Sequence, residues 1–414
     1  MARVDGIDPH VIAKAQIDRD RARLARVRPW VKARVELFAH KVDRMTRSPL
    51  AFLRGSAALF YDVLAGVPQL AAGPGGEGFI VGDLHLENFG AFRPEPAQTH
   101  HEGEPAAVFD VNDFDDCAVA PWRFDLLRLT TSLILGGREL GANGRETLEL
   151  CDALLDAYAA HPRSLPPAPR TVRTLLATVS ARSRAELLAG RTEVRHATRR
   201  FVRGPRYLEL APAVKRDAEK AFSAYVHEHV PKGRRDALEI CDMAFRVAGT
   251  GSLGCLRVAF LVAGKGGRDG HWVFDMKEED AEASVARLVG SKGGPRGAAR
   301  VEAGLRACLK DVPRGLGVVT LRGRSMLVRR LTPQEDKLDL ERFPKEELPE
   351  LARLLGALVA RAHLRGRRGP SRSWTRAERR SIVDRAVRLA GVHEAAYLAY
   401  CRLAGDATGA PRRR

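Results

Sequence analysis

Apolar residues follow two different spacings along this chain of 414 residues, and the two spacings predict different structures. In residues 1–70, 171–240, 348–365 and 374–404 they recur mainly at the three- and four-residue intervals of amphipathic helices. In residues 243–335, β-branched and aromatic residues instead form short runs bounded by glycines, a pattern typical of strands. We therefore expect an α+β protein with a large helical lobe and a small antiparallel-sheet lobe.

A second group of strands is predicted early in the chain. Phe79–Val81 has the composition of a strand end, and residues 89–92 and 107–111 are expected to pair as a hairpin. Residues 94–106, rich in Pro, His and Glu, would form its loop. Polar residues gather at both ends of this hairpin: Asp83 and Asn88 before it, then Asp110, Asn112, Asp113, Asp115 and Asp116.

These polar residues suit phosphoryl transfer. That chemistry needs a carboxylate to orient the attacking hydroxyl, and an Asn and a second Asp to hold Mg²⁺ against the phosphates. We take Asp83 as the candidate catalytic carboxylate and Asn88 and Asp113 as candidate Mg²⁺ ligands. Asp110 or Asp115 could supply a second carboxylate ligand. The alternative is that these are ordinary turn residues, in which Asp and Asn are common.

A candidate phosphate clamp follows much later in the chain. Gly249, Thr250, Gly251, Ser252 and Gly254 lie between two predicted strands, where glycines let backbone N–H groups approach phosphate oxygens. Dinucleotide-binding glycine motifs are followed by a helix, whereas here a strand follows. Lys277 ends the next strand and could contact the phosphates as a point charge, or it could be an exposed strand lysine. Its acidic partner could be Glu282 or Glu302.

The early motif resembles a known superfamily. Gly82–His85 with Asn88 is similar to the catalytic loop of aminoglycoside phosphotransferases and protein kinases. Asn112–Asp116 and Ala120–Leu126 resemble the phosphotransferase segment that leads into a long helix. This resemblance implies that Asp113 binds metal, that Asp125 supports the catalytic loop backbone, and that Asp110 supports the site. It also gives His85 a place in the motif, either touching the transferred phosphate or orienting the loop.

The order of the two motifs is the reverse of that in kinases. Residues 1–78 show helical spacing and supply no nucleotide clamp, so the clamp comes after the catalytic loop. We infer a circularly permuted, two-lobed kinase-like fold, since domain termini often lie close enough for permutation. Residues 1–242 would form the large lobe with a basic helical insert at 171–240. Residues 243–335 would form the nucleotide-clamping lobe, and residues 336–414 would return to the large lobe.

Further segments narrow the resemblance. Arg44–Gly55 looks like the entry signature of the bacterial domain of unknown function 2252, and three other segments carrying the candidate site match it too. So does Ala357–Arg365. The chain is therefore identified as a member of that family. Membership implies a kinase-like fold and nucleotide chemistry, but it does not name the reaction.

Composition adds the expected partners and location. Lys and Arg exceed Asp and Glu by 69 to 51, which favours polyanionic partners such as nucleotides, although a solvated basic surface explains the same excess. On a helix, Arg195, Arg199 and Arg203 would share one face. Nucleic acid is the less favoured partner, because only 6% of residues are aromatic. Six scattered cysteines, no leader segment and no membrane-length apolar run indicate a cytoplasmic protein without a membrane partner.

The leading hypothesis is an ATP- and Mg²⁺-dependent phosphotransferase that acts on a hydroxyl of an unidentified small molecule. A second hypothesis keeps the same site but transfers AMP. A third is a non-catalytic nucleotide-sensing or nucleic-acid-binding protein. Acceptor identity and oligomeric state are not encoded in any pattern that these residues show.

Overall fold

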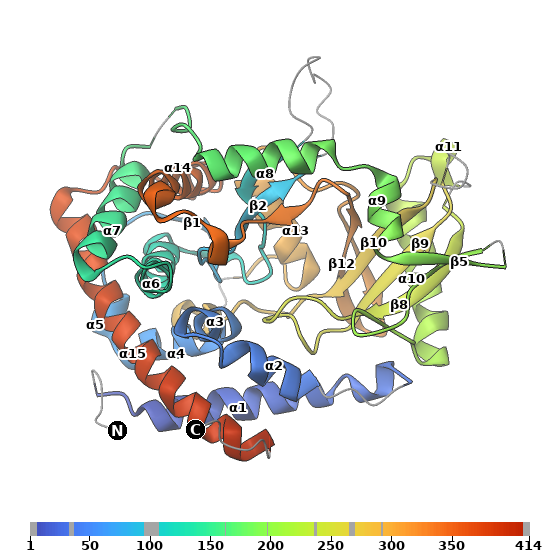
Figure 1. Cartoon of the computed structure of the whole chain (residues 1–414), viewed down its shortest axis with the longest axis horizontal. Coiled ribbons are helices and arrows are strands. Elements are labelled where there is room, and N and C mark those ends of the chain that lie inside the picture. Colours follow the sequence, from blue (N-terminus) through green and yellow to red (C-terminus); the bar gives the residue numbers. More distant parts are fainter. Residues whose placement is uncertain are drawn as a thin grey trace.

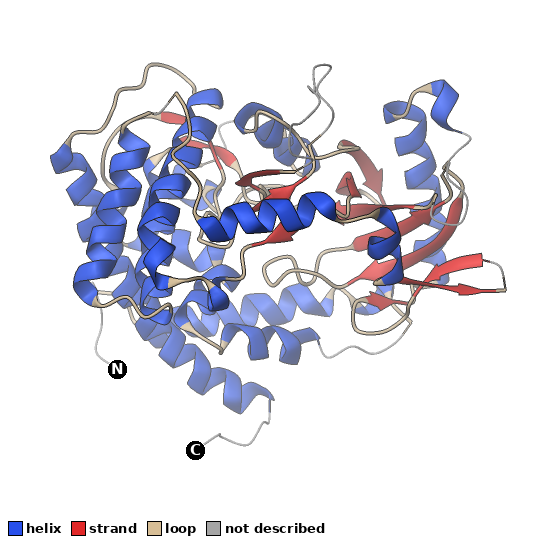
Figure 2. Ribbon diagram, turned by 45° about the horizontal axis from the view of Figure 1, so that its top comes forward, coloured by secondary structure: helices blue, strands red, loops and turns tan. Residues whose placement is uncertain are grey.

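In the computed structural model the described residues are 6–32, 37–94, 107–161, 163–196, 198–235, 238–264, 270–290 and 293–408. Helices gather on one side of the molecule and a six-stranded antiparallel sheet lies on the other (Figure 1). Figure 2 shows the same separation, with helices in blue and strands in red. We call these the helical part and the sheet part. The predicted α+β class with antiparallel sheets is confirmed.

The helical part is built around α6 (Arg123–Glu139), in which every residue from Phe124 to Gly137 is buried. A helix that is buried on all sides must be enclosed by other elements. In the same part of the molecule, α7 and α14 pack against each other. They approach so closely that a Cβ on Gly356 would lie 2.1 Å from the Leu154 carbonyl oxygen. The other helices here are α1 (Pro9–Ala25), α2 (Leu37–Met45), α3 (Pro49–Gly55), α4 (Ala57–Gly66), α5 (Pro68–Ala71), α7 (Gly144–Ala159), α14 (Leu348–Arg365) and α15 (Arg376–Thr408).

The sheet part has the strand order β11-β12-β10-β9-β8-β7, with antiparallel neighbours throughout. Helix α10 (Pro212–His229) covers one face, where Phe222 stacks on Phe260 at 4.5 Å between ring centroids. Strand β9 is buried along its whole length, as its continuous apolar run requires. The strands are β7 (Tyr207–Leu208), β8 (Ile240–Arg246), β9 (Arg257–Val262), β10 (Trp272–Glu278), β11 (Gly317–Leu321) and β12 (Arg324–Leu331).

Smaller elements join the two parts. The predicted early hairpin is present, because β2 and β3 pair antiparallel, and β13, on the chain that leaves the sheet, adds a third strand. Helix α1 contributes Ile17 to the helical core and Leu24 to the core of the sheet part, so it links both. The small elements are β1 (Glu77–Ile80), β2 (Phe89–Phe92), β3 (Val108–Val111), β4 (Ala118–Pro121), β13 (Asp336–Lys337), α8 (Arg170–Ala181), α9 (Arg184–Ala189), α11 (Lys232–Arg235), α12 (Ala286–Val289) and α13 (Ala298–Cys308).

The basic insert differs from the prediction. Residues 171–240 are not helical throughout, because β5 (Thr192–Arg195) and β6 (Thr198–Phe201) form a hairpin. Arg195, Arg199 and Arg203 therefore share no helix face. Arg195 pairs with Glu193, Arg199 donates to Thr192, and Arg203 binds both Glu209 and Asp242. A spacing of four arises in paired strands as well as in helices, and strand pairing decides the outcome here.

The predicted bounds of one helix and of the sheet segment can be compared with the structure. Helix α14 has the predicted bounds of 348–365, and β8 starts slightly before the predicted sheet segment, at Ile240. The predicted hairpin loop lies outside the described residues from 95 to 106. Within the described ranges, none of the helices combines the length and apolar character that crossing a bilayer requires.

Candidate active site

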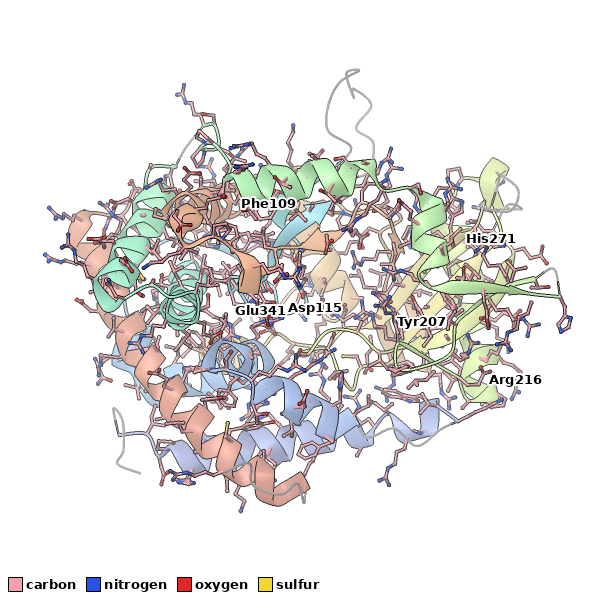
Figure 3. The ribbon with its side chains drawn as sticks, viewed as in Figure 1. Phe109, Asp115, Tyr207, Arg216, His271 and Glu341 are labelled. Atoms are coloured by element: carbon pink, nitrogen blue, oxygen red, sulfur yellow. The ribbon has the colours of Figure 1, made fainter. Side chains whose placement is uncertain are left out.

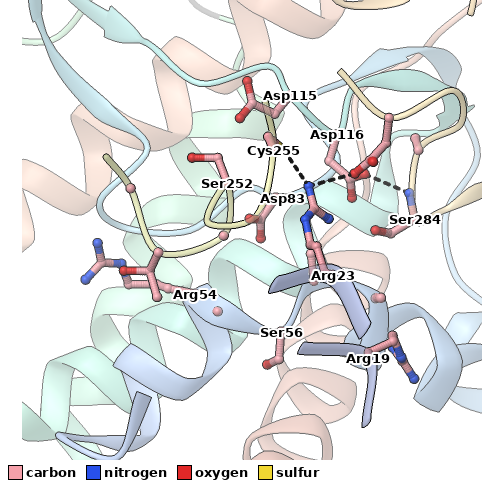
Figure 4. Close-up of a pocket in the computed structure, with 18 of the residues that line it drawn as sticks. Arg19, Arg23, Arg54, Ser56, Asp83, Asp115, Asp116, Ser252, Cys255 and Ser284 are labelled. Carbon is pink, nitrogen blue, oxygen red and sulfur yellow. Dashed lines mark hydrogen bonds and ion pairs between the residues drawn. The ribbon is translucent and has the colours of Figure 1, made fainter. Parts of the chain in front are cut away.

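A cavity of about 610 Å³ lies between the helical part and the sheet part. Figure 4 shows Asp83, Asp115, Ser252 and Arg54 around it, and Figure 3 places Asp115 near the middle of the molecule. Most of the predicted site residues line this one cavity. They are Asp83, His85, Asn88, Asp113, Gly249, Thr250, Gly251, Ser252 and Lys277.

Three predicted residues do not line it. Gly254 has φ +92° and packs against Arg23. A glycine is needed here for the backbone conformation and this close packing. Asp110 lines neither this cavity nor the second one described below, because strand alternation turns it away from the side that Val111 faces. Asp110 is therefore poorly placed as a second metal ligand. Asp125 lies fully buried behind the loop.

The loop that carries Asp83 is fixed through its backbone. Asp125, in the first turn of α6, accepts hydrogen bonds from the N–H groups of Val81 at 2.7 Å and Gly82 at 2.9 Å. The Tyr61 hydroxyl donates to the Gly82 carbonyl at 2.5 Å. Gly82 has φ +84°, and a Cβ there would lie 2.0 Å from the Asp116 carbonyl oxygen. Only glycine fits this turn.

Asp125 is itself held by a buried histidine. His363 Nε2 on α14 lies 3.0 Å from the Asp125 carboxylate, and its Nδ1 lies 3.0 Å from the Tyr158 hydroxyl. Since a carboxylate only accepts, the Nε2 proton goes to Asp125 and Nδ1 accepts from Tyr158. Trp122 stacks on the imidazole at 5.3 Å. The chain from Tyr158 to the loop is therefore connected by hydrogen bonds throughout.

Asp83 faces a buried arginine. Arg128 on α6 is fully buried, and its Nε donates to Asp83 Oδ1 at 2.8 Å. Among the described residues, all hydrogen bonds to this carboxylate go to Oδ1, so Oδ2 is the atom left for a substrate hydroxyl. Burial raises the pKa of Asp83 to about 7, against the pull of Arg128. The group therefore changes charge near neutral pH.

His85 and Asn88 shape the same loop. Asn88 is buried and donates its amide N–H to the Asp83 carbonyl at 2.6 Å, so its amide oxygen is the atom that could bind a cation. His85 Nδ1 accepts from the Glu87 backbone N–H at 3.2 Å, which is an orienting contact inside the loop. Burial holds the pKa of His85 well below its usual range, so it is neutral. Arg54 pairs with Glu87 at 2.7 Å rather than lying free on the surface.

Lys277 contacts the acidic turn, by which we mean residues 113–116. The sequence order of the two motifs does not reveal this contact. Its ammonium forms ion pairs with Asp115 and, at 3.2 Å, with Glu279. Neither predicted partner takes part, because Glu282 pairs with Arg296 and Glu302 with Arg306. Glu279 lies two residues beyond Lys277 in extended chain, which puts both side chains on one face.

Negative charge exceeds positive charge around this lysine. Burial and the neighbouring Asp115 raise the pKa of Asp113, and burial and Asp115 raise that of Glu279 to about 8. Burial works against ionisation of Asp115 too, but Lys277 holds the pKa of Asp115 below its usual range. A divalent cation would relieve this repulsion, and the Asn88 amide and the Asp113 carboxylate are oxygen donors of the kind Mg²⁺ takes.

The protein would supply few ligands to such a metal ion. In the part of the chain that the structure describes, no group of three or more His, Cys, Asp or Glu side chains could hold a metal ion. Mg²⁺ commonly keeps water and phosphate oxygens as ligands, so one Asn and one Asp fit a site that forms together with a nucleotide.

The glycine-rich segment connects β8 to β9 along one side of the cavity. Gly249 has φ +75°, and its carbonyl accepts from Arg44 of α2 at 2.8 Å. The Ser252 hydroxyl donates to the Ala248 carbonyl at 3.1 Å, which closes the turn. Arg44 thus holds one end of the segment, and Arg23 of α1 lies against Gly254 at the other.

The sequence interpretation missed two arginines. Arg300 on α13 donates to the carbonyl oxygens of Asp115 at 3.0 Å, Asp280 at 3.1 Å and Cys117, so it fixes the acidic turn. Nothing in the sequence singles it out. Arg128 has a signal, because it is the one cation in the apolar run of α6 from Phe124 to Gly137, and a buried arginine requires an acidic partner.

A second cavity of about 340 Å³ adjoins the first and shares Asp113, Asp115 and Lys277 with it. Its walls come from the inner face of the sheet, from α13 and from the β2–β3 hairpin. Several arginines line it, including Arg246, Arg257 and Arg329.

Comparison with known proteins gives one match. A family model described as an uncharacterized protein conserved in bacteria, DUF2252, matches residues 34–403, a range that includes every candidate site residue. No curated protein and no solved structure matches the chain significantly. The expected likeness to phosphotransferases and kinases therefore stays a prediction.

Proposed function

We propose that this chain, which belongs to the bacterial family DUF2252, is an ATP- and Mg²⁺-dependent phosphotransferase that acts on a hydroxyl of a small molecule. One observation carries the proposal. A single cavity collects Asp83 and Asn88 from an early loop, Asp113 from a later turn, and Lys277 with Gly249–Ser252 from the sheet part. Each of these groups has a role in phosphoryl transfer.

In this mechanism, Lys277 and the backbone of the glycine-rich segment bind the nucleotide phosphates. Asn88 and Asp113 would hold Mg²⁺, which neutralises charge on the phosphate oxygens when bound. Asp83 Oδ2 accepts the proton of the acceptor hydroxyl as the oxygen–phosphorus bond to the γ-phosphate forms. The bond from that phosphorus to ADP breaks, and ADP leaves with the electron pair. Arg128 holds Asp83 in position and does not contact the substrate.

We further propose that the fold is a circularly permuted kinase-like fold. The catalytic loop precedes the sheet in the chain, while the two meet in space. Helices α1 and α15, the first and last of the described chain, pack against each other, as permutation would require (Figure 1). The hydrogen bonds that Asp125 accepts from two backbone N–H groups of the loop support this proposal, since the resemblance implies a supporting carboxylate for that loop.

Transfer of AMP is a second candidate, because the second cavity is lined by arginines. In that reaction the acceptor oxygen bonds to the α-phosphorus, the bond to pyrophosphate breaks, and pyrophosphate leaves with the electron pair. The proton again goes to Asp83. The same residues would serve, and only the placement of the nucleotide would differ.

A screen of hydroxyl compounds with ATP and Mg²⁺ tests the proposal. Asp83→Asn keeps a side chain that can accept from Arg128, and it should abolish product formation while ATP binding persists. Asp43→Asn, at an exposed carboxylate paired with Arg47, is the matched control and should keep full turnover. Mass analysis of the product separates phosphoryl from AMP addition. Undiminished turnover of Asp83→Asn would contradict the assigned base.

A further inference from the structure

The second cavity has two unlike walls. One wall is apolar and includes Val301 and Leu305 of α13 and Leu309, which caps that helix. The opposite wall is the inner face of the sheet, which presents charged side chains from β8, β9, β10 and β12. An apolar ligand would gain nothing from such a face, and burying it there would leave charged groups without solvent.

On the strands of this wall, the three arginines Arg246, Arg257 and Arg329 meet one carboxylate, Asp275. Asp275 on β10 accepts from Arg257 through Nε at 2.9 Å and through Nη2 at 2.6 Å, and it also pairs with Arg246 at 2.8 Å. Arg329 lies directly across from Asp275 in the β10–β12 register. Arg329 forms an ion pair with Glu335 at 3.4 Å.

A fourth arginine lies at the edge of the same cavity. Arg191 donates to the Tyr207 hydroxyl at 3.3 Å, and no ion pair of Arg191 is found among the described residues. Tyr207 is labelled on the sheet in Figure 3. Asp275 and Glu335 are the carboxylates that pair with arginines of this wall. The other carboxylates that line the cavity include Asp115 and Glu279, which pair with Lys277, and Asp336, which pairs with Arg182.

Arg246 shows that the positive charge is not fully compensated. Its Nε is buried and has no hydrogen-bond partner within the described residues. Burial, together with the positive charges of Arg257 and Arg329, lowers the pKa of Arg246 to about 10, although Asp275 opposes the shift. A buried donor without an acceptor is costly, and an anion in the cavity would satisfy it.

We propose that the second cavity is a phosphate-binding subsite, in which Arg191, Arg246 and Arg329 receive a phosphate group other than the one attacked beside Asp83. Arg257 is committed to Asp275 through two nitrogens and positions the wall. The proposal rests on the proposed function only in placing the transfer beside Asp83. The phosphate can come from two sources: the terminal phosphates of the nucleotide, or a phosphorylated acceptor.

Calorimetric titration of the wild-type protein with inorganic pyrophosphate is the primary test. Pyrophosphate should bind, and Arg246→Gln and Arg329→Gln should each weaken it by about tenfold or more, the size expected for one lost charge-assisted contact. Arg195→Gln, at an exposed arginine of the β5–β6 hairpin, is the matched control and should bind as the wild type does. Arg246→Gln should fold, because Arg257 still binds Asp275.

Titration with ATP and AMP separates the two sources. If Arg246→Gln weakens ATP but not AMP, the terminal phosphates of the nucleotide occupy the subsite, and the phosphorus beside Asp83 is then the α-phosphorus. If it weakens pyrophosphate and leaves both nucleotides unchanged, the subsite serves a phosphorylated acceptor.

Two results would overturn the inference. They are absence of pyrophosphate binding by the folded wild type, and binding that the Arg246 and Arg329 substitutions leave unchanged. If ATP binding in that case still depends on Lys277, the proposed function stands without the subsite. If pyrophosphate binding depends on Arg246 but ATP does not bind, the subsite stands and the proposed function fails.

Discussion

The loop that carries Asp83 and the glycine-rich segment opposite it face the same cavity but are held very differently. Asp125 and Tyr61 bind three backbone groups of the residues entering the first loop, all of them buried. The glycine-rich segment contacts the helical part near its two ends, where Arg44 donates to the Gly249 carbonyl in an exposed hydrogen bond and Arg23 packs against Gly254. The difference suggests a rigid side for chemistry and an adjustable side for the nucleotide, since pre-positioned groups favour catalysis.

Asp125→Ala should have the largest effect on this comparison. It leaves the N–H groups of Val81 and Gly82 and the Nε2 of His363 without their acceptor. We expect a loss of about 3 kcal/mol or more in the free energy of unfolding, measured by urea denaturation. A loss below about 1 kcal/mol would mean that the loop is not fixed by this carboxylate.

The variants Gly82→Ala and Gly251→Ala compare the two regions directly through the free energy of unfolding. At Gly82 the φ of +84° and the 2.0 Å approach to the Asp116 carbonyl predict a loss of about 2–3 kcal/mol. At Gly251 the nearest atom to an added Cβ is 3.7 Å away, and we expect a change within about 0.5 kcal/mol. Urea denaturation of both variants checks this, and equal losses would remove the distinction between a rigid and an adjustable side.

The pH dependence of stability tests the surroundings of Asp83 itself. The pKa of Asp83 is raised by burial to about 7, so the folded state binds the proton more tightly than the unfolded state does. The stabilisation from protonated Asp83 is full below about pH 4 and is lost as pH rises through about 7. The stability of the wild type relative to Asp83→Asn should therefore fall between about pH 4 and about pH 7 and be level above that. A difference that is constant with pH would contradict the raised pKa.

The sequence predicts those parts of the site that depend on local pattern. The β2–β3 hairpin and the bounds of α14 follow from periodicity and turn chemistry. That Asp83, Asn88 and Lys277 would line one cavity was expected from the spacing of the motifs and their resemblance to phosphotransferases. The pairing of Lys277 with Asp115 and the clamp of Arg300 on the acidic turn could not be predicted, because each joins segments far apart in the chain. The β5–β6 hairpin was predicted as helix for a related reason, since pairing with a neighbouring strand outweighs residue spacing.

The charged wall of the second cavity could not be predicted from the sequence either. Arg246, Arg257 and Asp275 lie in three separate apolar runs, where each charged residue taken alone resembles an exposed strand position. Their convergence depends on the register of β8, β9 and β10. Strand register is set by packing across the whole sheet and is not visible in any one segment.

The central claim is that the early acidic motifs and the late glycine–lysine segment form one nucleotide site. Calorimetric titration of ATP with Mg²⁺ into the wild type, Lys277→Ala and Asp113→Asn tests it most directly, with Arg195→Gln as the control. We predict that both site variants bind at least about tenfold more weakly while the control is unchanged. Absence of binding by the folded wild type, or weakening in only one of the two site variants, would contradict a shared site.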